Sequence, residues 1–417
     1  MSTSMVKGNP LKLMVQFALP LLLGNLLQQT YNIIDAAIVG QILGAKALAS
    51  VGATSSVQFL VLGFCIGICA GFGVPVAKYF GAEKKDTMRN YIFNGAVLTA
   101  GAAVVLTSAC VILCNQILHI LSVPEDIYVN AYRYILIIFL AFAAVLNIFL
   151  DLFCIVVLKW GCAGAAIATI TAQAISGICC LIVISRKMEL MWLGKDDRHM
   201  RKEAAQELLL MGIPTGLQYS ITAIGSMVMQ SANNGLGSVY VSAFTAAMRI
   251  KQFAMCPFDA VSTAASVFCS QNLGAKQPDR IRKGLRQAVT IGVAYGALIG
   301  LVLIFGGRTL TRIFVNKSAV DVLDASAKYL RYLGFFFWSL GILNVNRMVT
   351  QGLGYSGRAV FSGVTEMIAR VIVSVGFVGT YGFTAICCAD QAAWISASCY
   401  ILPTCLMCVR RATEKMK

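Results

Sequence analysis

The chain has 417 residues, of which 58% are hydrophobic and only 12% are charged, and its mean hydropathy is +0.76. A soluble domain cannot bury that much apolar surface, so we expect an integral membrane protein. The net charge of +16 at pH 7 does not indicate a nucleic-acid partner, because the lysines and arginines gather in short segments between apolar runs.

Eleven apolar runs of helix length follow one another along the chain. Outer-membrane barrels instead show alternating segments of about ten residues, so we predict an all-α polytopic membrane protein. The runs cover residues 13–39, 51–77, 91–118, 127–158, 161–185, 208–232, 240–270, 288–306, 329–353, 359–380 and 382–409.

Three strongly basic segments separate these runs, at residues 78–89, 186–202 and 276–286. By the positive-inside rule, we expect these segments and the basic C-terminus to face the cytoplasm. The loop at 119–126 has no Lys or Arg and is predicted to be external.

The second half of the chain repeats part of the first. YFGAEKKDTMRNYI at 79–92 aligns with NLGAKQPDRIRKGL at 272–285, so that Gly81 matches Gly274. Both basic segments follow the second apolar run of their half. The halves are therefore expected to form a parallel repeat, related by an axis along the membrane normal.

We predict two helical lobes around a central cleft, residues 1–195 and 196–417. Transporters built from such repeats use the cleft for alternating access. Further along the chain Trp160 matches Tyr381, so the offset between the halves is larger there. The first lobe is thus shorter than the second by about 28 residues, somewhat more than one membrane span. The missing part is placed around 135–145.

The shortening makes the run at 127–158 resemble two spans fused into one, which leaves two topologies. A single crossing places the basic segment 186–202 outside. A run that enters and leaves on the same face keeps this segment inside, but it is too short for two full crossings. Length favours the first topology and flanking charge the second, and we give charge slightly more weight.

One carboxylate, Asp35, lies inside the first apolar run, and no other charged residue occurs from Leu13 to Val39. Burying it in hydrocarbon costs on the order of 2.5–3.5 kcal/mol. The pattern therefore favours an ion or proton site that faces a polar cavity. The alternative is a carboxylate that only caps or pins a neighbouring helix.

Several segments resemble the bacterial branch of the multidrug and toxic compound extrusion (MATE) family. They are LPLLLGNLLQQTYNIIDAAIVGQILGAKALASVG at 19–52, KYFGA at 78–82, LNIFLDLFCIVVLKWGCAGAAIAT at 146–169 and QNLGA at 271–275. The resemblance covers nearly the whole chain. It implies two six-helix lobes and export of cationic or amphipathic compounds, coupled to inward H⁺ or Na⁺ and without a cofactor. Members of this family normally have twelve spans, whereas eleven runs are seen in this sequence.

The resemblance places a cation site at Asp35, Asn147, Asp151 and Thr169. Asn147 and Asp151 are four residues apart, so they project from one helix face. Their oxygen ligands suit Na⁺, whereas converging carboxylates without a metal ion are expected to hold a proton. Both coupling ions therefore stay open. The alternative is that Asn147 and Asp151 only hydrogen-bond helices together.

In the second lobe, the apolar runs contain Asp259, Glu366 and Arg370. Glu366 and Arg370 are four residues apart, which predicts an intrahelical salt bridge. The sixth run has glutamines but no acid, so we expect no strong second cation site. Met and aromatic side chains of this half supply adaptable surface for substrates, or plain packing. The predicted substrate cleft consists of Gln28, Gln218, Met227, Phe253 and Asp259.

These expectations combine into a monomeric secondary active exporter, an antiporter of cationic or amphipathic small molecules in the bacterial inner membrane. The alternatives are a transport-impaired remnant of such an exporter or a lipid-linked precursor flippase, which is expected to have a strongly cationic cavity. The sequence has no P-loop, His cluster or nucleophile motif, so we expect no enzyme activity. No metal is expected beyond a Na⁺ at Asp35 and Asp151.

Overall fold

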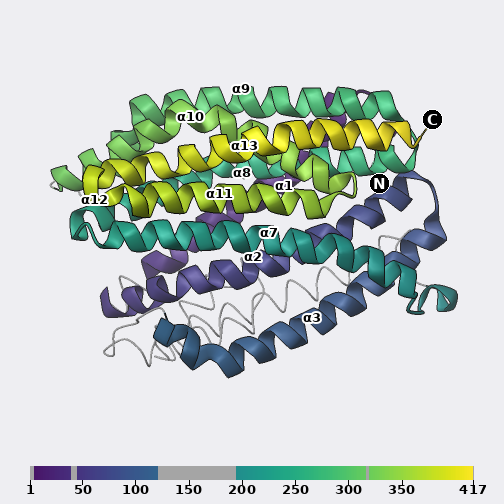
Figure 1. Cartoon of the computed structure of the whole chain (residues 1–417), viewed down its shortest axis with the longest axis horizontal. Helices are drawn as coiled ribbons and strands as arrows, with labels where there is room; N and C mark the ends of the chain where they lie inside the picture. The colour runs from purple at the N-terminus through teal and green to yellow at the C-terminus, as the bar shows by residue number, and fades with distance from the viewer. Residues whose placement is uncertain (1–3, 39–44, 121–193, 316–318, 417) are drawn as a thin grey trace. The chain divides into compact units, whose positions relative to one another are not determined.

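The computed structural model describes residues 4–38, 45–120, 194–315 and 319–416. Within these ranges the regular secondary structure is helical (Figure 1). Its elements are α1 (Pro10–Ile38), α2 (Ala45–Gly81), α3 (Lys85–Ile120), η4 (Lys195–Asp197), α7 (Lys202–Asn234), α8 (Ser238–Gly274), α9 (Pro278–Thr311), α10 (Val320–Gly352), α11 (Ser356–Gly376), α12 (Val378–Tyr381) and α13 (Phe383–Glu414).

The predicted all-α membrane class is confirmed. Each apolar run predicted inside the described ranges forms a helix. Seven helices of the described residues are long and apolar enough to cross a membrane. The runs at 127–158 and 161–185 and the shortening around 135–145 lie outside the described residues.

Most of the basic segment 276–286 is helical, although the sequence suggested a connection between spans. α9 begins at Pro278, because proline at the first helical position loses no hydrogen bond and presets the helical φ. Asp279 in the same first turn places a negative charge at the positive end of the helix dipole. Basic residues therefore extend the helix beyond its apolar part.

The predicted repeat is visible in the turns between helices. α2 ends at Gly81 and α8 ends at Gly274, its match in the sequence repeat. In each turn one residue adopts a left-handed φ, 58° at Glu83 and 53° at Lys276. Ala82 N donates to the Lys78 carbonyl at 3.0 Å, and its counterpart Ala275 N donates to the Gln271 carbonyl at 2.9 Å. The two halves thus share their backbone hydrogen bonding here.

The chain divides into two compact units. Unit 1 comprises Met1–Asn25, Ile66–Met88 and Gln206–Lys417, and unit 2 comprises Leu26–Cys65 and Arg89–Ala205. The predicted lobes, divided between residues 195 and 196, stay a prediction.

In unit 2, two buried asparagines near the start of α3 hold the end of the basic segment 186–202. Asn90 Nδ2 donates to the carbonyls of Asp197, at 3.1 Å, and His199, at 2.9 Å. Asn94 Oδ1 accepts from Arg201 N at 3.1 Å. The described end of this segment therefore lies at the N-terminal end of α3, and the topology that flanking charge favoured stays a prediction.

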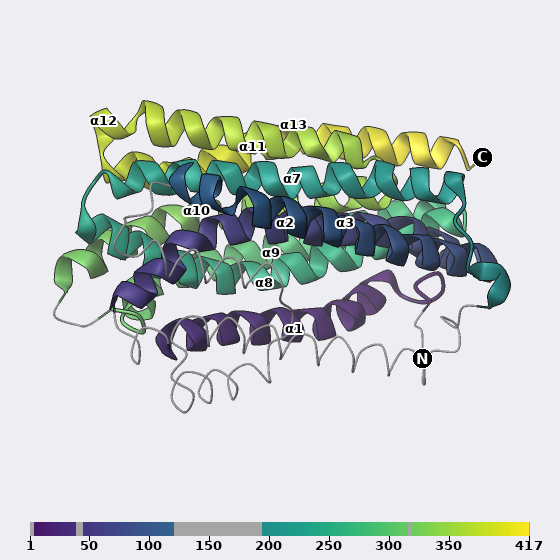
Figure 2. The same ribbon diagram turned by 90° about the horizontal axis from the view of Figure 1, so that it is seen from below.

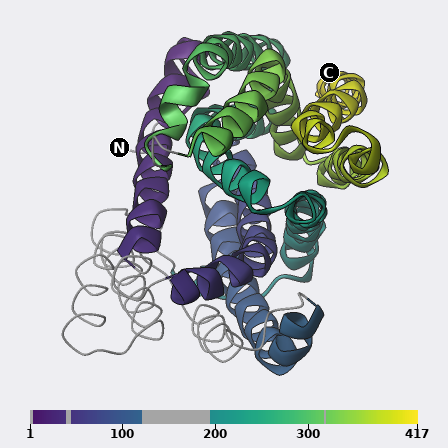
Figure 3. The same cartoon turned by 90° about the vertical axis from the view of Figure 1, so that its left-hand side faces the viewer.

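In unit 1, α9 and α10 lie side by side (Figure 1), as the green ribbons of Figure 3 also show. They approach each other through glycines. Gly292, Gly296 and Gly300 recur every fourth residue of α9 and face the backbone of α10. A Cβ added to Gly296 would lie 2.6 Å from Trp338 Cα and 2.8 Å from the Phe337 carbonyl oxygen. Small residues at this spacing let helices pack backbone to backbone in a membrane, where lipid is as apolar as leucine.

The rest of unit 1 packs around an aromatic core. α11 and α13 run side by side (Figures 1 and 2), and α10 contacts α8 and α13. Phe337 of α10 meets the rings of Phe258 and Trp394 at centroid distances of 5.5 and 5.6 Å. All three rings are buried.

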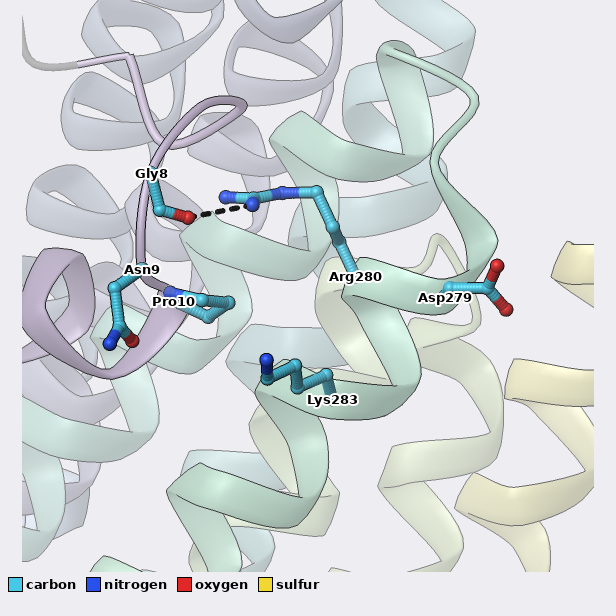
Figure 4. A pocket seen from close by; sticks show the side chains of 6 residues that line it. All are labelled: Gly8, Asn9, Pro10, Asp279, Arg280 and Lys283. Atoms are coloured by element: carbon cyan, nitrogen blue, oxygen red, sulfur yellow. Dashed lines mark hydrogen bonds between the residues drawn. The ribbon is translucent and has the colours of Figure 1, made fainter.

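The N-terminal segment of unit 1 is tied to the α8–α9 turn. Met5 N donates to Gln271 Oε1 at 2.8 Å. The guanidinium of Arg280 donates to the carbonyl of Gly8 at 2.7 Å (Figure 4) and to the carbonyl of Met5 at 2.9 Å. Met5 is only 1% exposed. A small pocket of about 300 Å³ lies beside this contact, lined by Gly8, Asn9, Pro10, Asp279, Arg280 and Lys283.

The glycine contact between α9 and α10 predicts that Gly296→Ala lowers the stability of the protein. The added Cβ must displace the α10 backbone, which costs about 1–3 kcal/mol. Gly306→Ala on the same helix is the control, because the neighbours of its Cβ lie at 3.9 and 4.0 Å. That variant gains up to about 1 kcal/mol of helix propensity. Thermal unfolding of the purified proteins in detergent measures both, and equal midpoints would contradict the packing assigned to Gly296.

Candidate functional site

Most of the predicted first-lobe cation site lies outside the described residues. Asp35 falls in the last turn of α1, which ends at Ile38. Asn147, Asp151 and Thr169 all lie outside the described ranges. The convergence of Asp35 with these three residues therefore stays a prediction.

The predicted cleft residues fall on three helices. Gln28 is an exposed residue of α1 in unit 2. In unit 1, Gln218 of α7 is 3% exposed, and its Oε1 accepts a hydrogen bond from Gln351 Nε2 at 3.3 Å. Met227 of α7 and Phe253 of α8 are half-buried.

Asp259 differs from the other predicted cleft residues because it is an exposed acid halfway along α8. Tyr219 of α7 lies within electrostatic range of both Asp259 and Arg347. An exposed carboxylate at this depth of a membrane helix is expected to face a polar cavity rather than lipid. The position suits the predicted contact with a cationic substrate, which itself stays a prediction.

Unit 1 also contains a set of buried charges that sequence reasoning largely missed. Six side chains from four helices form a continuous hydrogen-bonded group, which we name the buried ionic cluster. It consists of Lys251 (α8), Tyr329 and Arg347 (α10), Glu366 and Arg370 (α11) and Asp390 (α13).

Asp390 is the centre of one half of the buried ionic cluster. Its Oδ2 accepts hydrogen bonds from Lys251 Nζ and Tyr329 OH, both at 2.5 Å. Its Oδ1 accepts from Arg370 Nε at 3.1 Å. The Asp390 side chain is 0% exposed, so these bonds replace all of its hydration.

Glu366 is the centre of the other half. Its Oε1 accepts from Arg370 Nη2 at 2.9 Å, and its Oε2 accepts from Arg347 Nη2 at 2.5 Å. Arg347 Nε donates to Ser362 Oγ at 2.9 Å. The predicted Glu366–Arg370 salt bridge is present, but it is one link of a group that joins α8, α10, α11 and α13.

The arrangement does not resemble a cation site, because basic side chains of the protein already neutralise both carboxylates. Arg370 bridges Asp390 and Glu366, with 3.0 Å to the first and 2.9 Å to the second. Three bases thus face two acids, and the charged cluster has a net charge of +1 when all are ionised. Among the described residues, no group of three His, Cys, Asp or Glu side chains is arranged to hold a metal ion.

The sequence did contain a signal for the missed residues. Lys251, Arg347 and Asp390 each lie inside a predicted apolar run, as Asp35 does, and an ionisable residue in such a run indicates a polar partner. Their partners lie on other helices, which the helical spacing used for Glu366 cannot reveal.

Comparison with known proteins identifies relatives along most of the chain. The MatE family model matches residues 20–161 and 214–375. The Bacillus subtilis (strain 168) protein named "Probable multidrug resistance protein YpnP" is 28% identical, over 84% of this chain and 84% of its own length. A crystal structure of MATE in complex with MaL6 has a TM-score of 0.90 at 18% identity, covering 99% of each chain. An outward-facing multidrug resistance MATE family transporter of the MOP superfamily has a TM-score of 0.90 at 18% identity, covering 98% of each chain.

The buried ionic cluster predicts a large loss of stability in Glu366→Gln. Arg347 and Arg370 would then lose the charge between them, and removing one partner of a buried ion pair costs about 3–5 kcal/mol. Glu414→Gln is the control, because the Arg410–Glu414 pair is exposed and such pairs contribute little. Thermal unfolding in detergent should show a much lower midpoint for Glu366→Gln alone. A midpoint equal to that of the control would show that the cluster does not stabilise the unit.

Proposed function

Because this chain belongs to the MatE family, we propose that it is an antiporter that exports cationic or amphipathic small molecules in exchange for H⁺ or Na⁺. The observation that carries the proposal is an acid, Asp35, in the part of α1 from Leu13 onwards, which has no other charged residue. A second acid, Asp259 on α8, is exposed within an apolar run of the other half of the sequence. The printed name of the YpnP relative, a multidrug resistance protein, supports this class of substrate.

The coupling follows from differential binding of the ion and the substrate. An ion drives transport only if it binds one conformation more tightly than the other. Asp35 would bind the ion within the set predicted with Asn147, Asp151 and Thr169. Asp259 would attract a cationic substrate, and the half-buried Met227 and Phe253 would supply apolar contacts that adapt to different shapes.

The repeated turns suggest how one side of the transporter closes. A Cβ on Gly274 would overlap the Lys78 carbonyl oxygen and lie 2.9 Å from Ala82 N, and Gly81 meets the Gln271 backbone in the same way. Because Gly81 matches Gly274 in the sequence repeat, each of these contacts is the counterpart of the other. We propose that the two turns seal the cytoplasmic side in this conformation, with the N-terminal segment anchored beside them. Alternating access then requires the turns to separate.

We expect Asp35→Asn to abolish ion-driven export, because the amide neither takes up a proton nor supplies the negative charge that attracts Na⁺. The measurement is ethidium transport in proteoliposomes with an imposed proton or sodium gradient. Asp324→Asn, at an exposed pair with Arg308, is the matched control and should transport normally. Full transport by Asp35→Asn would contradict the role of Asp35. A wild-type protein that no ion gradient drives would contradict the antiporter and favour a transport-impaired remnant.

We expect Gly274→Ala to slow export, because its Cβ prevents the two turns from meeting and the cytoplasmic side from closing. Gly73→Ala on α2 is the control, since a Cβ there meets nothing within 4 Å. Two quantities should change together in Gly274→Ala. The rate of ethidium export should fall, and a cysteine placed at Lys78 should become more accessible to a membrane-impermeant thiol reagent. Unchanged export and accessibility would show that the turn contact is not a seal.

A further inference from the structure

We propose that Lys251 exchanges a proton during the transport cycle, so that the buried ionic cluster alternates between a protonated, positively charged form and a deprotonated, neutral form. The role given to this proton in transport rests on the proposed function. The exchange itself is a property of the cluster and can be measured without any transport.

The first step of the argument is the charge imbalance. The cluster contains three basic side chains, Lys251, Arg347 and Arg370. It contains only two acidic ones, Asp390 and Glu366. Side chains of all five are between 0% and 8% exposed. Excess charge in such a place is costly, and a buried site relieves this cost by losing or gaining a proton.

The second step identifies the group that gives up the proton. Arginine does not deprotonate in proteins, which excludes Arg347 and Arg370. Protonating Asp390 or Glu366 would raise the net charge. Tyr329 OH already donates a hydrogen bond to Asp390 Oδ2. Deprotonation of Tyr329 would therefore place two negatively charged oxygens side by side.

Loss of the Lys251 proton has none of these consequences. Asp390 keeps its bond from Arg370 Nε, and Glu366 keeps those from Arg347 and Arg370. Each carboxylate thus stays paired with an arginine, and the cluster becomes neutral. The step is a simple dissociation, in which the ammonium Nζ becomes an amine and the proton passes to water.

Lys251 also has partners that favour its charged form, so the two forms can be close in energy. Its Nζ lies 2.5 Å from Asp390 Oδ2 and 5.3 Å from the centre of the Trp394 ring, and an aromatic face attracts a cation. Other titratable or charged groups lie on the helices of this region. They are Arg249 and Asp259 on α8, Tyr295 on α9, Tyr329 and Arg347 on α10, Glu366 and Arg370 on α11, and Cys387 and Asp390 on α13.

The exchange would couple proton and substrate within one unit. Asp259 lies eight residues beyond Lys251 on the same helix, or about 12 Å at 1.5 Å per residue. A cationic substrate at Asp259 meets one positive charge fewer after Lys251 has lost its proton. By linkage, binding of that substrate favours release of the proton, as an exporter driven by inward proton flow requires.

Trp394 provides a direct test. The chain has four tryptophans, and the variant Trp160→Phe, Trp192→Phe, Trp338→Phe leaves Trp394 as the reporter of the ammonium above its ring. We expect its emission to change with a single-proton titration as the pH is varied over the range in which the protein stays folded. Lys251→Arg should remove this transition, because the guanidinium keeps its charge. The matched control Lys328→Arg, at an exposed lysine that donates to Thr384, should keep it. A flat emission in the parent protein overturns the proposal, and so does a transition that persists in Lys251→Arg.

Transport separates this proposal from the proposed function. We expect Lys251→Arg in proteoliposomes to reduce proton-driven ethidium export by about tenfold while ethidium exchange at equal pH persists. Proton-driven export at the wild-type rate overturns the role of Lys251 but leaves the antiporter standing. Export by the wild-type protein that is driven by a sodium gradient but not by a proton gradient has the same consequence: it overturns the role of Lys251 and leaves the antiporter standing. A Trp394 titration in a protein that exports nothing supports proton exchange and overturns the proposed function.

Discussion

Unit 1 depends on the pairing of two buried carboxylates with three basic side chains. Each ion would be costly in a membrane interior on its own, and the cost falls only when every charge has a partner with good geometry. Arg370 makes this possible, because its planar guanidinium reaches Glu366 and Asp390 at once. The two acids lie on α11 and α13, and the remaining bases lie on α8 and α10. The cluster therefore specifies which helices are neighbours, something apolar side chains specify poorly in lipid.

Close backbone contact is the second constraint on the arrangement. Helices in a membrane gain little from burying apolar side chains, so they associate where small residues allow many van der Waals contacts. Gly292, Gly296 and Gly300 provide such a surface towards α10. Gly81 and Gly274 use the same principle at the repeated turns. The first contact joins helices that are adjacent in the chain, whereas the second joins turns from different halves of the sequence and is therefore suited to a movable contact.

The sequence predicted the membrane class, the helices and the repeat because each has a local signal. The length of each apolar run predicts a membrane helix, and the matching segments around Gly81 and Gly274 predict the repeat. It predicted the Glu366–Arg370 pair for the same reason, since both residues lie on one helix face. It did not predict the pairing of Lys251 with Asp390, because these residues are 139 positions apart and no spacing rule connects them. The glycine stripe of α9 was present in the sequence, but its partner on α10 depends on the packed structure.

The repeat also shows where the two halves have diverged. With Gly81 aligned to Gly274, Asp35 corresponds to Val228 and Lys251 corresponds to Gln58. The geometry of the turns is kept in both halves, but these two ionisable residues are not. In the first half, Asp35 has no basic residue within its apolar run, whereas the cluster of the second half has one base more than it has acids. Protonation of Asp35 would add one positive charge to the first half, whereas deprotonation of Lys251 would remove one from the second half. The two halves can therefore respond to the same proton gradient through different groups, a carboxylate in the first and a lysine in the second.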